Sequence, residues 1–217
     1  MSSQTEDLSG PLPRGRHRLT RDQVQSSQYR RLCGAALVAV GELGYATTTV
    51  ADIVSRAQVA RRTFYAMFAS KDECFAAAYD FGVALGMRRL REVMAVSGSL
   101  NFDDRVRTLF EIYLATLAAQ PAATRALYVE TLVAGAPLQP HRARVRRLFG
   151  DYFMDVAQLG YGAGELRAEP DRELVDMLLG GIDDRIRACL QEQGVAALPE
   201  LAPLFTRTAM ALCDTGR

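Results

Sequence analysis

The sequence predicts an all-α protein made of a small N-terminal three-helix domain and a larger C-terminal helical domain. Apolar residues recur at spacings of three and four along most of the chain from residue 26 onward, as they do on the buried faces of amphipathic helices. No segment shows the alternation of a strand, and no internal repeat of 20 to 50 residues is evident. The 217 residues are 49% hydrophobic, which is enough for a sizeable core.

Residues 1–23 are expected to form a disordered basic arm. The segment is polar, with two glycines and two prolines between residues 10 and 15, so it cannot bury enough apolar surface to become ordered. Arg14 and Arg16 are part of its positive charge.

The first helix is expected from about Ser26 to Leu43, followed by Gly44 as its C-cap. Its apolar positions repeat at helical spacing and comprise Leu32, Ala36, Ala39, Val40 and Leu43.

The segment from Thr49 to Lys71 has the pattern of a helix-turn-helix followed directly by another helix. Thr49 is the expected N-cap of the first short helix, and Asp52 three residues later completes a variant of the capping box. In the second short helix the packing side carries phenylalanines, whereas the outward positions are basic, hydroxylic or aromatic: Arg61, Arg62, Thr63 and Tyr65. Such side chains suit the major groove of DNA.

This stretch resembles the TetR family of bacterial transcriptional repressors from Arg30 to Ala76. The matching positions are Gly44, Tyr45, Thr49, Ile53, Ala57, Val59, Ala60, Thr63, Phe64, Tyr65, Phe68 and Lys71. Gln58 departs from the pattern because the family usually turns on glycine there, and Ala60 departs because serine or threonine usually caps the recognition helix. A missing cap costs about 1 kcal/mol, so the recognition helix should fray slightly at its start.

Residues 24–69 are therefore expected to form the helix-turn-helix DNA-binding domain. The arginines at 61 and 62 are placed for guanine edges or phosphates, and Thr63 for a base edge or a thymine methyl. Tyr65, Thr49 and Lys71 are placed for phosphates. The N-terminal arginines at 14 and 16 could lie in the minor groove, although a solvated tail without such a role is the alternative. Charge agrees with a DNA partner, because residues 1–71 hold ten basic and five acidic residues, whereas 72–217 hold 16 and 20.

Residues 70–217 are expected to form a ligand-binding and dimerisation domain. Ser70 and Glu73 make a capping box that opens a long helix, and the resemblance implies that this helix acts as a lever when a small molecule binds. Further apolar stripes indicate four more helical segments. Aromatic and apolar side chains from them are candidates to line an effector pocket: Phe110, Tyr113, Leu117, Tyr128, Phe149, Phe153 and Met177. They suit an apolar or aromatic effector.

The last two helices, about 170–193 and 199–214, are expected to form the dimer interface that the resemblance implies. Candidate interface residues are Leu178, Ile182, Ile186, Leu204, Phe205 and Leu212. The alternative is that both helices simply close the core of the monomer. A dimer would present two recognition helices to a near-palindromic operator.

Several other classes of protein are disfavoured. No apolar run reaches the length of a membrane span and the N-terminus lacks the features of a signal peptide, so a cytoplasmic location is expected. The four cysteines are far apart and fit neither a zinc site nor a disulfide framework, and no cofactor is expected. The glycines between residues 160 and 164 form a loop rather than a nucleotide site, because no strand precedes them.

Catalysis is not expected, because the two histidines lie far apart without suitable neighbours and no hydrolase or nucleotide motif is present. The arginine run from 142 to 147 is interpreted as a solvated helix face. Two alternatives to a ligand-responsive repressor remain. One is a ligand-independent activator or global regulator with the same fold, and the other is a helical ligand-binding protein that does not bind DNA.

Overall fold

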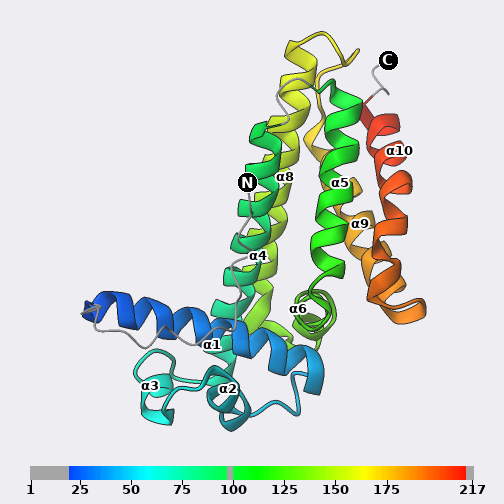
Figure 1. Ribbon diagram of the computed structural model, residues 1–217. Coiled ribbons are helices and arrows are strands. Elements are labelled where there is room, and N and C mark those ends of the chain that lie inside the picture. The colour runs from blue at the N-terminus through cyan, green and yellow to red at the C-terminus, as the bar shows by residue number, and fades with distance from the viewer. Residues whose placement is uncertain (1–19, 97–99, 214–217) are drawn as a thin grey trace.

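A computed structural model describes residues 20–96 and 100–213, and every element in this part of the chain is helical (Figure 1). The elements in order are α1 (Arg21–Leu43), α2 (Val50–Ala57), α3 (Arg61–Tyr65), α4 (Lys71–Val96), α5 (Phe102–Ala118), α6 (Pro121–Arg125), the π-helical turn η1 (Ala126–Glu130), α7 (Thr131–Ala134), the 3₁₀ turn η2 (Ala136–Leu138), α8 (Gln139–Gly162), α9 (Arg172–Glu192), the 3₁₀ turn η3 (Val195–Leu201) and α10 (Ala202–Cys213). The predicted all-α architecture with an N-terminal helix-turn-helix and a larger helical body is confirmed.

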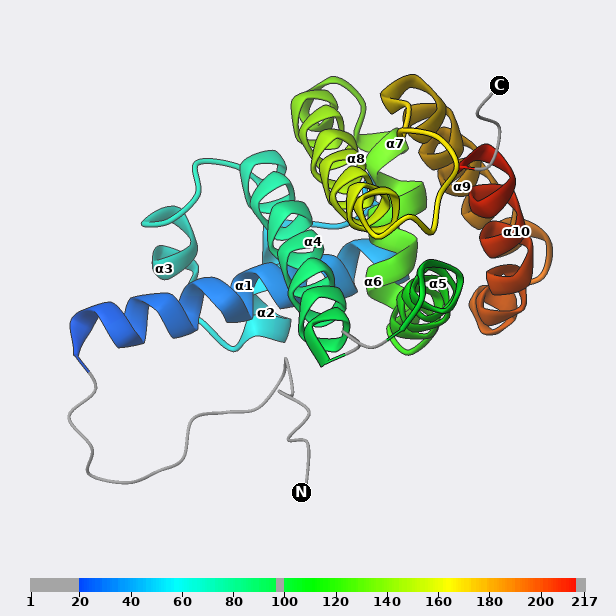
Figure 2. The ribbon, with the colours of Figure 1, turned by 90° about the horizontal axis from the view of Figure 1, so that it is seen from above.

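The helices form two groups that share α4. Figure 1 shows α1, α2 and α3 at one end of the molecule, with α4, α5, α8 and α10 rising from them as a bundle. Seen from above, α3 and the pair α9 and α10 lie on opposite sides of the molecule, with α4 and α8 between them (Figure 2). No helix in the described ranges is long and apolar enough to cross a bilayer.

Helix α1 begins earlier than the sequence pattern predicts. Thr20 is its N-cap, and Thr20 and Gln23 form a reciprocal capping box, which extends the helix five residues before Ser26. The apolar periodicity misses this extension because its residues are almost all exposed. The predicted end is confirmed, since Gly44 terminates α1 with a φ of 86° that a residue with a side chain rarely adopts.

The apolar core does not divide at residue 70. One buried cluster joins α1, α2, α3 and the first half of α4 to Ala126, Ala134, Leu138 and Val145 of the larger domain. A second cluster joins α5, α8, α9 and α10. The helix-turn-helix is therefore packed against the larger domain through shared core residues. Because this core is close-packed, a displacement of one domain shifts the side chains of the other.

Helix α6 and the turn η1 form the contact with α1. A Cβ atom added to Gly41 of α1 would lie 1.8 Å from the carbonyl oxygen of Ala122 in α6. The two backbones consequently touch where only glycine fits. This close approach fixes the larger domain against α1, the first helix of the DNA-binding end.

The expected loop at Gly160–Gly164 is only partly correct, because α8 continues through Gly162. Gly160 is buried against the ring of Phe102, whose nearest carbon would lie 2.6 Å from an added Cβ. Packing of α8 on α5 thus keeps the helix intact despite its glycines. The chain turns only at Gly164, which has a φ of 74°.

Candidate nucleic-acid interface and internal cavity

The helix-turn-helix begins with the capping interaction that the sequence predicts. The hydroxyl of Thr49 accepts the Asp52 N–H at 3.3 Å, and the Asp52 carboxylate accepts the Thr49 N–H at 2.8 Å and its hydroxyl at 2.6 Å. These bonds from Thr49 lower the pKa of Asp52. Thr49 remains exposed at the start of α2, where helix N–H groups favour an anion such as a phosphate.

The turn between α2 and α3 is left-handed at Gln58, with a φ of 51°. This conformation explains why glycine is usual there, since a side chain at positive φ is strained. Arg31 of α1 donates a hydrogen bond of 2.8 Å to the Gln58 carbonyl oxygen. Its guanidinium therefore holds the turn from outside the motif. The sequence pattern gives no sign of this contact.

Helix α3 is short and lacks a side-chain cap, because Ala60 offers no acceptor. Its inner residue Phe64 is completely buried and contacts the Phe68 ring with centroids 5.6 Å apart. Arg61, Arg62 and Tyr65 are exposed, as predicted, whereas Thr63 is half-buried. The guanidinium of Arg61 lies 5.7 Å from the centre of the Tyr65 ring, so these two side chains form one projecting unit.

Lys71 lies at the first position of α4, but its ammonium is already engaged. The Nζ atom donates a 2.7 Å hydrogen bond to the Tyr45 carbonyl oxygen and lies 4.4 Å from the centre of that ring. The Tyr45 hydroxyl donates to Asp72, and burial, followed by this bond, raises the pKa of the tyrosine. Lys71 therefore clamps the loop between α1 and α2 and adds its charge to the same surface. Arg14 and Arg16 lie outside the described residues.

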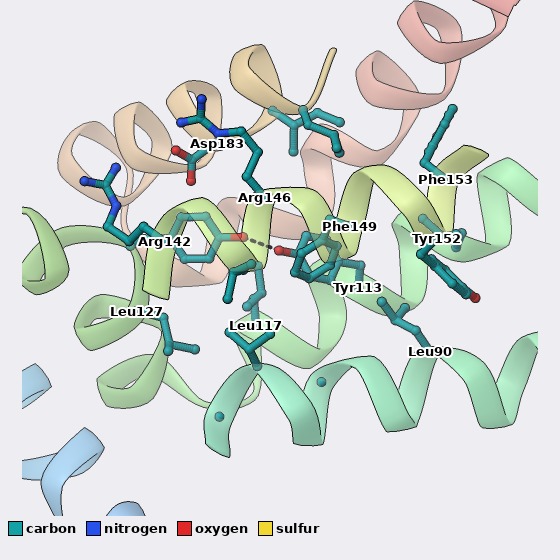
Figure 3. Close-up of a pocket in the computed structure, with 18 of the residues that line it drawn as sticks. Leu90, Tyr113, Leu117, Leu127, Arg142, Arg146, Phe149, Tyr152, Phe153 and Asp183 are labelled. Carbon is teal, nitrogen blue, oxygen red and sulfur yellow. Dashed lines mark hydrogen bonds between the residues drawn. The ribbon is translucent and has the colours of Figure 1, made fainter. Parts of the chain in front are cut away.

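An internal cavity of about 150 Å³ lies between α4, α5, η1, α8 and α9 (Figure 3). Six of the seven predicted pocket residues line it: Phe110, Tyr113, Leu117, Tyr128, Phe149 and Phe153. The seventh expectation is corrected, because Met177 faces away from the bundle on α9 and its side chain is 74% exposed. The sequence pattern also misses Gly82, Val83, Gly86 and Leu90 of α4, which form one wall.

Two tyrosines meet inside the cavity. The hydroxyls of Tyr113 and Tyr128 are hydrogen-bonded to each other, as the dashed line in Figure 3 shows. Burial raises the pKa of both, so both are neutral at physiological pH. Tyr113 also contacts Phe149, with ring centroids 5.6 Å apart. Tyr128 belongs to η1, the element that contacts α1.

Glu130 connects this wall to the helix-turn-helix. It follows Tyr128 by two residues in η1 and is only 4% exposed. Its carboxylate accepts the backbone N–H of Tyr45 at 2.8 Å and a hydrogen bond from Arg125 at 3.0 Å. A buried carboxylate of the larger domain therefore holds the loop that Lys71 clamps. Sequence reasoning assigns Glu130 no role, because a single acid in a helical pattern carries no signal.

Most residues of the expected dimer interface lie inside the single chain. Leu178, Ile182, Ile186 and Phe205 are at most 6% exposed and belong to the core of the single chain. Leu204 is 38% exposed, and Leu212 packs half-buried against the same core. Helical periodicity identifies an apolar face but does not say whether that face meets its own core or a partner.

The helix-turn-helix matches a family model described as bacterial regulatory proteins, tetR family, over residues 33–78. Residues 33–78 are thus similar to the DNA-binding segment of that family. No curated protein matches its sequence. The matched segment runs from α1 through the turn at Gln58 to the first part of α4, so it covers the DNA-binding end.

Solved structures of TetR-type regulators share the whole fold. The fatty acid degradation regulator FadR from Bacillus halodurans superposes with a TM-score of 0.73 at 17% identity, covering 84% of this chain and 94% of that one. FadR from Bacillus subtilis, solved in complex with stearoyl-CoA, gives 0.72 at 17% identity over 84% and 98%. The tetR regulator TylP from Streptomyces fradiae gives 0.67 at 24% identity over 88% of each chain. At these identities the superpositions show that the chain shares their fold.

Proposed function

We propose that the protein is a dimeric, ligand-responsive repressor that binds a near-palindromic operator and is released by a small molecule in the cytoplasm. Residues 24–69 bind the DNA, and residues 70–217 bind the ligand and form the dimer. The observation that carries this proposal is the bonded connection from the cavity wall through η1 and Glu130 to Tyr45.

The DNA contacts follow from the exposed side of α3. Arg61 and Arg62 bind guanine edges or phosphates, and Thr63 contacts a base edge or methyl group. Tyr65, Thr49 and Lys71 bind phosphates on either side of the groove. The arm with Arg14 and Arg16 adds contacts in the minor groove. The bonds that position Thr49 and Lys71 support this arrangement, because they fix both groups before DNA arrives.

The free volume of the cavity supports a coupling between ligand and DNA. A cavity near 150 Å³ accepts about one benzene-sized ring, so a larger apolar ligand has to displace the Tyr113 and Tyr128 pair. Displacing Tyr128 moves η1, and Glu130 then pulls on the loop at Tyr45. Useful release requires that the ligand favour the displaced state by about 1–3 kcal/mol. The half of α4 that lines the cavity moves with it and turns α3 away from the groove.

The dimer forms through the outward faces of α9 and α10. Met177 and Leu204 supply exposed apolar surface there, and Gly180 and Gly181 leave open space beside them. Large apolar side chains left exposed by the single chain support an interface on these faces. These residues replace most of the interface set expected from periodicity.

Binding of fluorescent duplexes from the DNA upstream of the gene tests the proposal by anisotropy over a range of salt concentrations. Arg61→Ala is expected to weaken operator binding by about 1–3 kcal/mol and random duplexes much less. Arg147→Ala is the control, because Arg147 is exposed on α8, far from α3 in the sequence. Equal losses on operator and random DNA would make Arg61 a phosphate contact. The absence of salt-dependent binding to any duplex would refute the proposed function.

The cavity disfavours the ligand-independent alternative, because a regulator without a ligand gains nothing from an internal void beside a buried tyrosine pair. The fold shared with a stearoyl-CoA complex of FadR supports an effector that has an apolar part. The predominantly aromatic and aliphatic lining agrees with that choice.

A further inference from the structure

The cavity is polarised along its length. Figure 3 shows Arg142, Arg146 and Asp183 together at one end, whereas Leu90, Tyr152 and Phe153 lie at the other. The two arginines are four residues apart on α8, so they project from the same face of that helix. Arg142 is half-buried and Arg146 is exposed, so the run is largely solvated, as expected, and two of its members also border the cavity.

Asp183 lies beside these two guanidiniums at the same end of the cavity, but its ion pair is formed elsewhere. Asp183 is paired with Arg187 of its own helix, and Asp80 is paired with Arg144 and His141. Within residues 20–96 and 100–213, no carboxylate lies within ion-pair distance of Arg142 or Arg146.

Tyr79 adds a neutral hydrogen-bond donor near the same end. Burial raises its pKa to about 12, Arg142 acts to lower it and Asp183 acts to raise it, which means that all three groups are within electrostatic reach. The hydroxyl consequently keeps its proton at physiological pH. Two forked cations and one hydroxyl donor at the charged end of an apolar cavity form a set that matches the oxygen atoms of an anion.

We propose that Arg142 and Arg146 form an anion subsite, and that the effector is an amphiphile with an apolar body and one carboxylate or phosphate end. This inference deepens the proposed function by naming the class of ligand. The apolar body enters among Tyr113, Tyr128 and Phe149, and the anionic end stays at the charged end of the cavity. Arginine suits this role because its planar group binds carboxylate and phosphate with two parallel hydrogen bonds.

A matched pair of fluorescent probes tests the subsite in the full-length protein. The probe 8-anilinonaphthalene-1-sulfonate carries an anionic group, and N-phenyl-1-naphthylamine has the same ring system without it. Arg142→Ala and Arg146→Ala should each weaken binding of the anionic probe by about 10-fold to 100-fold, the range of a hydrogen bond to a charged group. Binding of the neutral probe should change less than threefold. Arg147→Ala, the surface control on the same helix, should leave both affinities unchanged.

Equal losses for both probes, or an equal loss in Arg147→Ala, would overturn the subsite. Arg142→Lys should recover part of the affinity for the anionic probe, which a purely structural role of the arginine would not predict. Displacement of the neutral probe by decanoate, decyl phosphate and decanol then identifies the end group. If decanol displaces the probe with the same affinity as the two anions, the inference is also contradicted.

Release from DNA is measured separately. Decanoate or decyl phosphate that binds through the arginines and lowers operator affinity supports both proposals. If the anion binds as predicted but operator affinity is unchanged, the subsite stands and the release function fails.

Discussion

Replacing Glu130 is the sharpest test of the connection between the cavity and the DNA-binding end. Glu130→Ala removes the acceptor of the Tyr45 N–H and the partner of Arg125. Glu130→Gln keeps an amide oxygen that can still accept from Tyr45, but it loses the charge. Glu111→Ala is the control, because Glu111 is exposed on α5 and lies in no pocket wall.

The expected loss of stability follows from the burial of the Glu130 carboxylate. A hydrogen bond to a buried charged group contributes about 1.5–3 kcal/mol, whereas the ion pair with Arg125 adds little because that guanidinium is 56% exposed. Glu130→Ala should therefore cost about 2 kcal/mol, and Glu130→Gln about 1 kcal/mol or less. At 2–4 °C for each kcal/mol, the melting temperature of the alanine variant falls by about 4–8 °C.

Hydrogen exchange read at the Tyr45 amide reports the local effect. In Glu130→Ala this amide should exchange about 10-fold to 150-fold faster, with the glutamine variant intermediate and the Glu111 control unchanged. The ratio of operator affinities without and with decanoate should fall toward one. An unchanged exchange rate at Tyr45 would refute the structural connection. An unchanged affinity ratio with faster exchange would refute its role in release.

Further predictions concern packing, polarity, assembly and pH. Gly41→Ala should destabilise the protein by about 1–3 kcal/mol, because its Cβ would collide with backbone, whereas Gly86→Ala, which meets nothing within 4 Å, should be neutral or stabilising in thermal melts. Tyr152→Phe should leave the free energy of unfolding in urea unchanged or raise it by up to about 1 kcal/mol. The reason is that the Tyr152 hydroxyl is buried without a partner among the described residues. A large loss of stability would show that this hydroxyl does form a hydrogen bond. Met177→Glu should yield monomers in light scattering without lowering ligand binding, and a stable dimer would exclude that face. The pKa of Asp52 is lowered by its bonds with Thr49, so its carboxylate stabilises the folded state above the ordinary pKa of 3.8 and loses that effect as pH falls through the lowered, folded-state pKa. Asp52→Asn should therefore destabilise the protein most near pH 7, and its effect should shrink steadily as a series of thermal melts is taken to more acidic pH.

The sequence by itself determined the elements whose information is local. Thr49 and Asp52 cap α2 within three residues of each other, and Gly44 ends α1, so short-range rules suffice. In α3 the inner Phe64 and the outer Arg61 and Arg62 likewise identify the exposed face. Six of the residues expected to line an effector pocket do border the cavity, because the inward stripes of several helices converge on one interior.

Only the tertiary structure decided which apolar face meets which neighbour. Ile182 and Met177 lie on the same helix and are both apolar, yet one is buried in the core and the other is exposed. The bond from Glu130 to Tyr45 spans 85 residues, and the arginines of α8 acquire a cavity only when α9 packs beside them. A sequence records periodicity along one helix, whereas contacts between distant segments depend on how the helices pack in three dimensions.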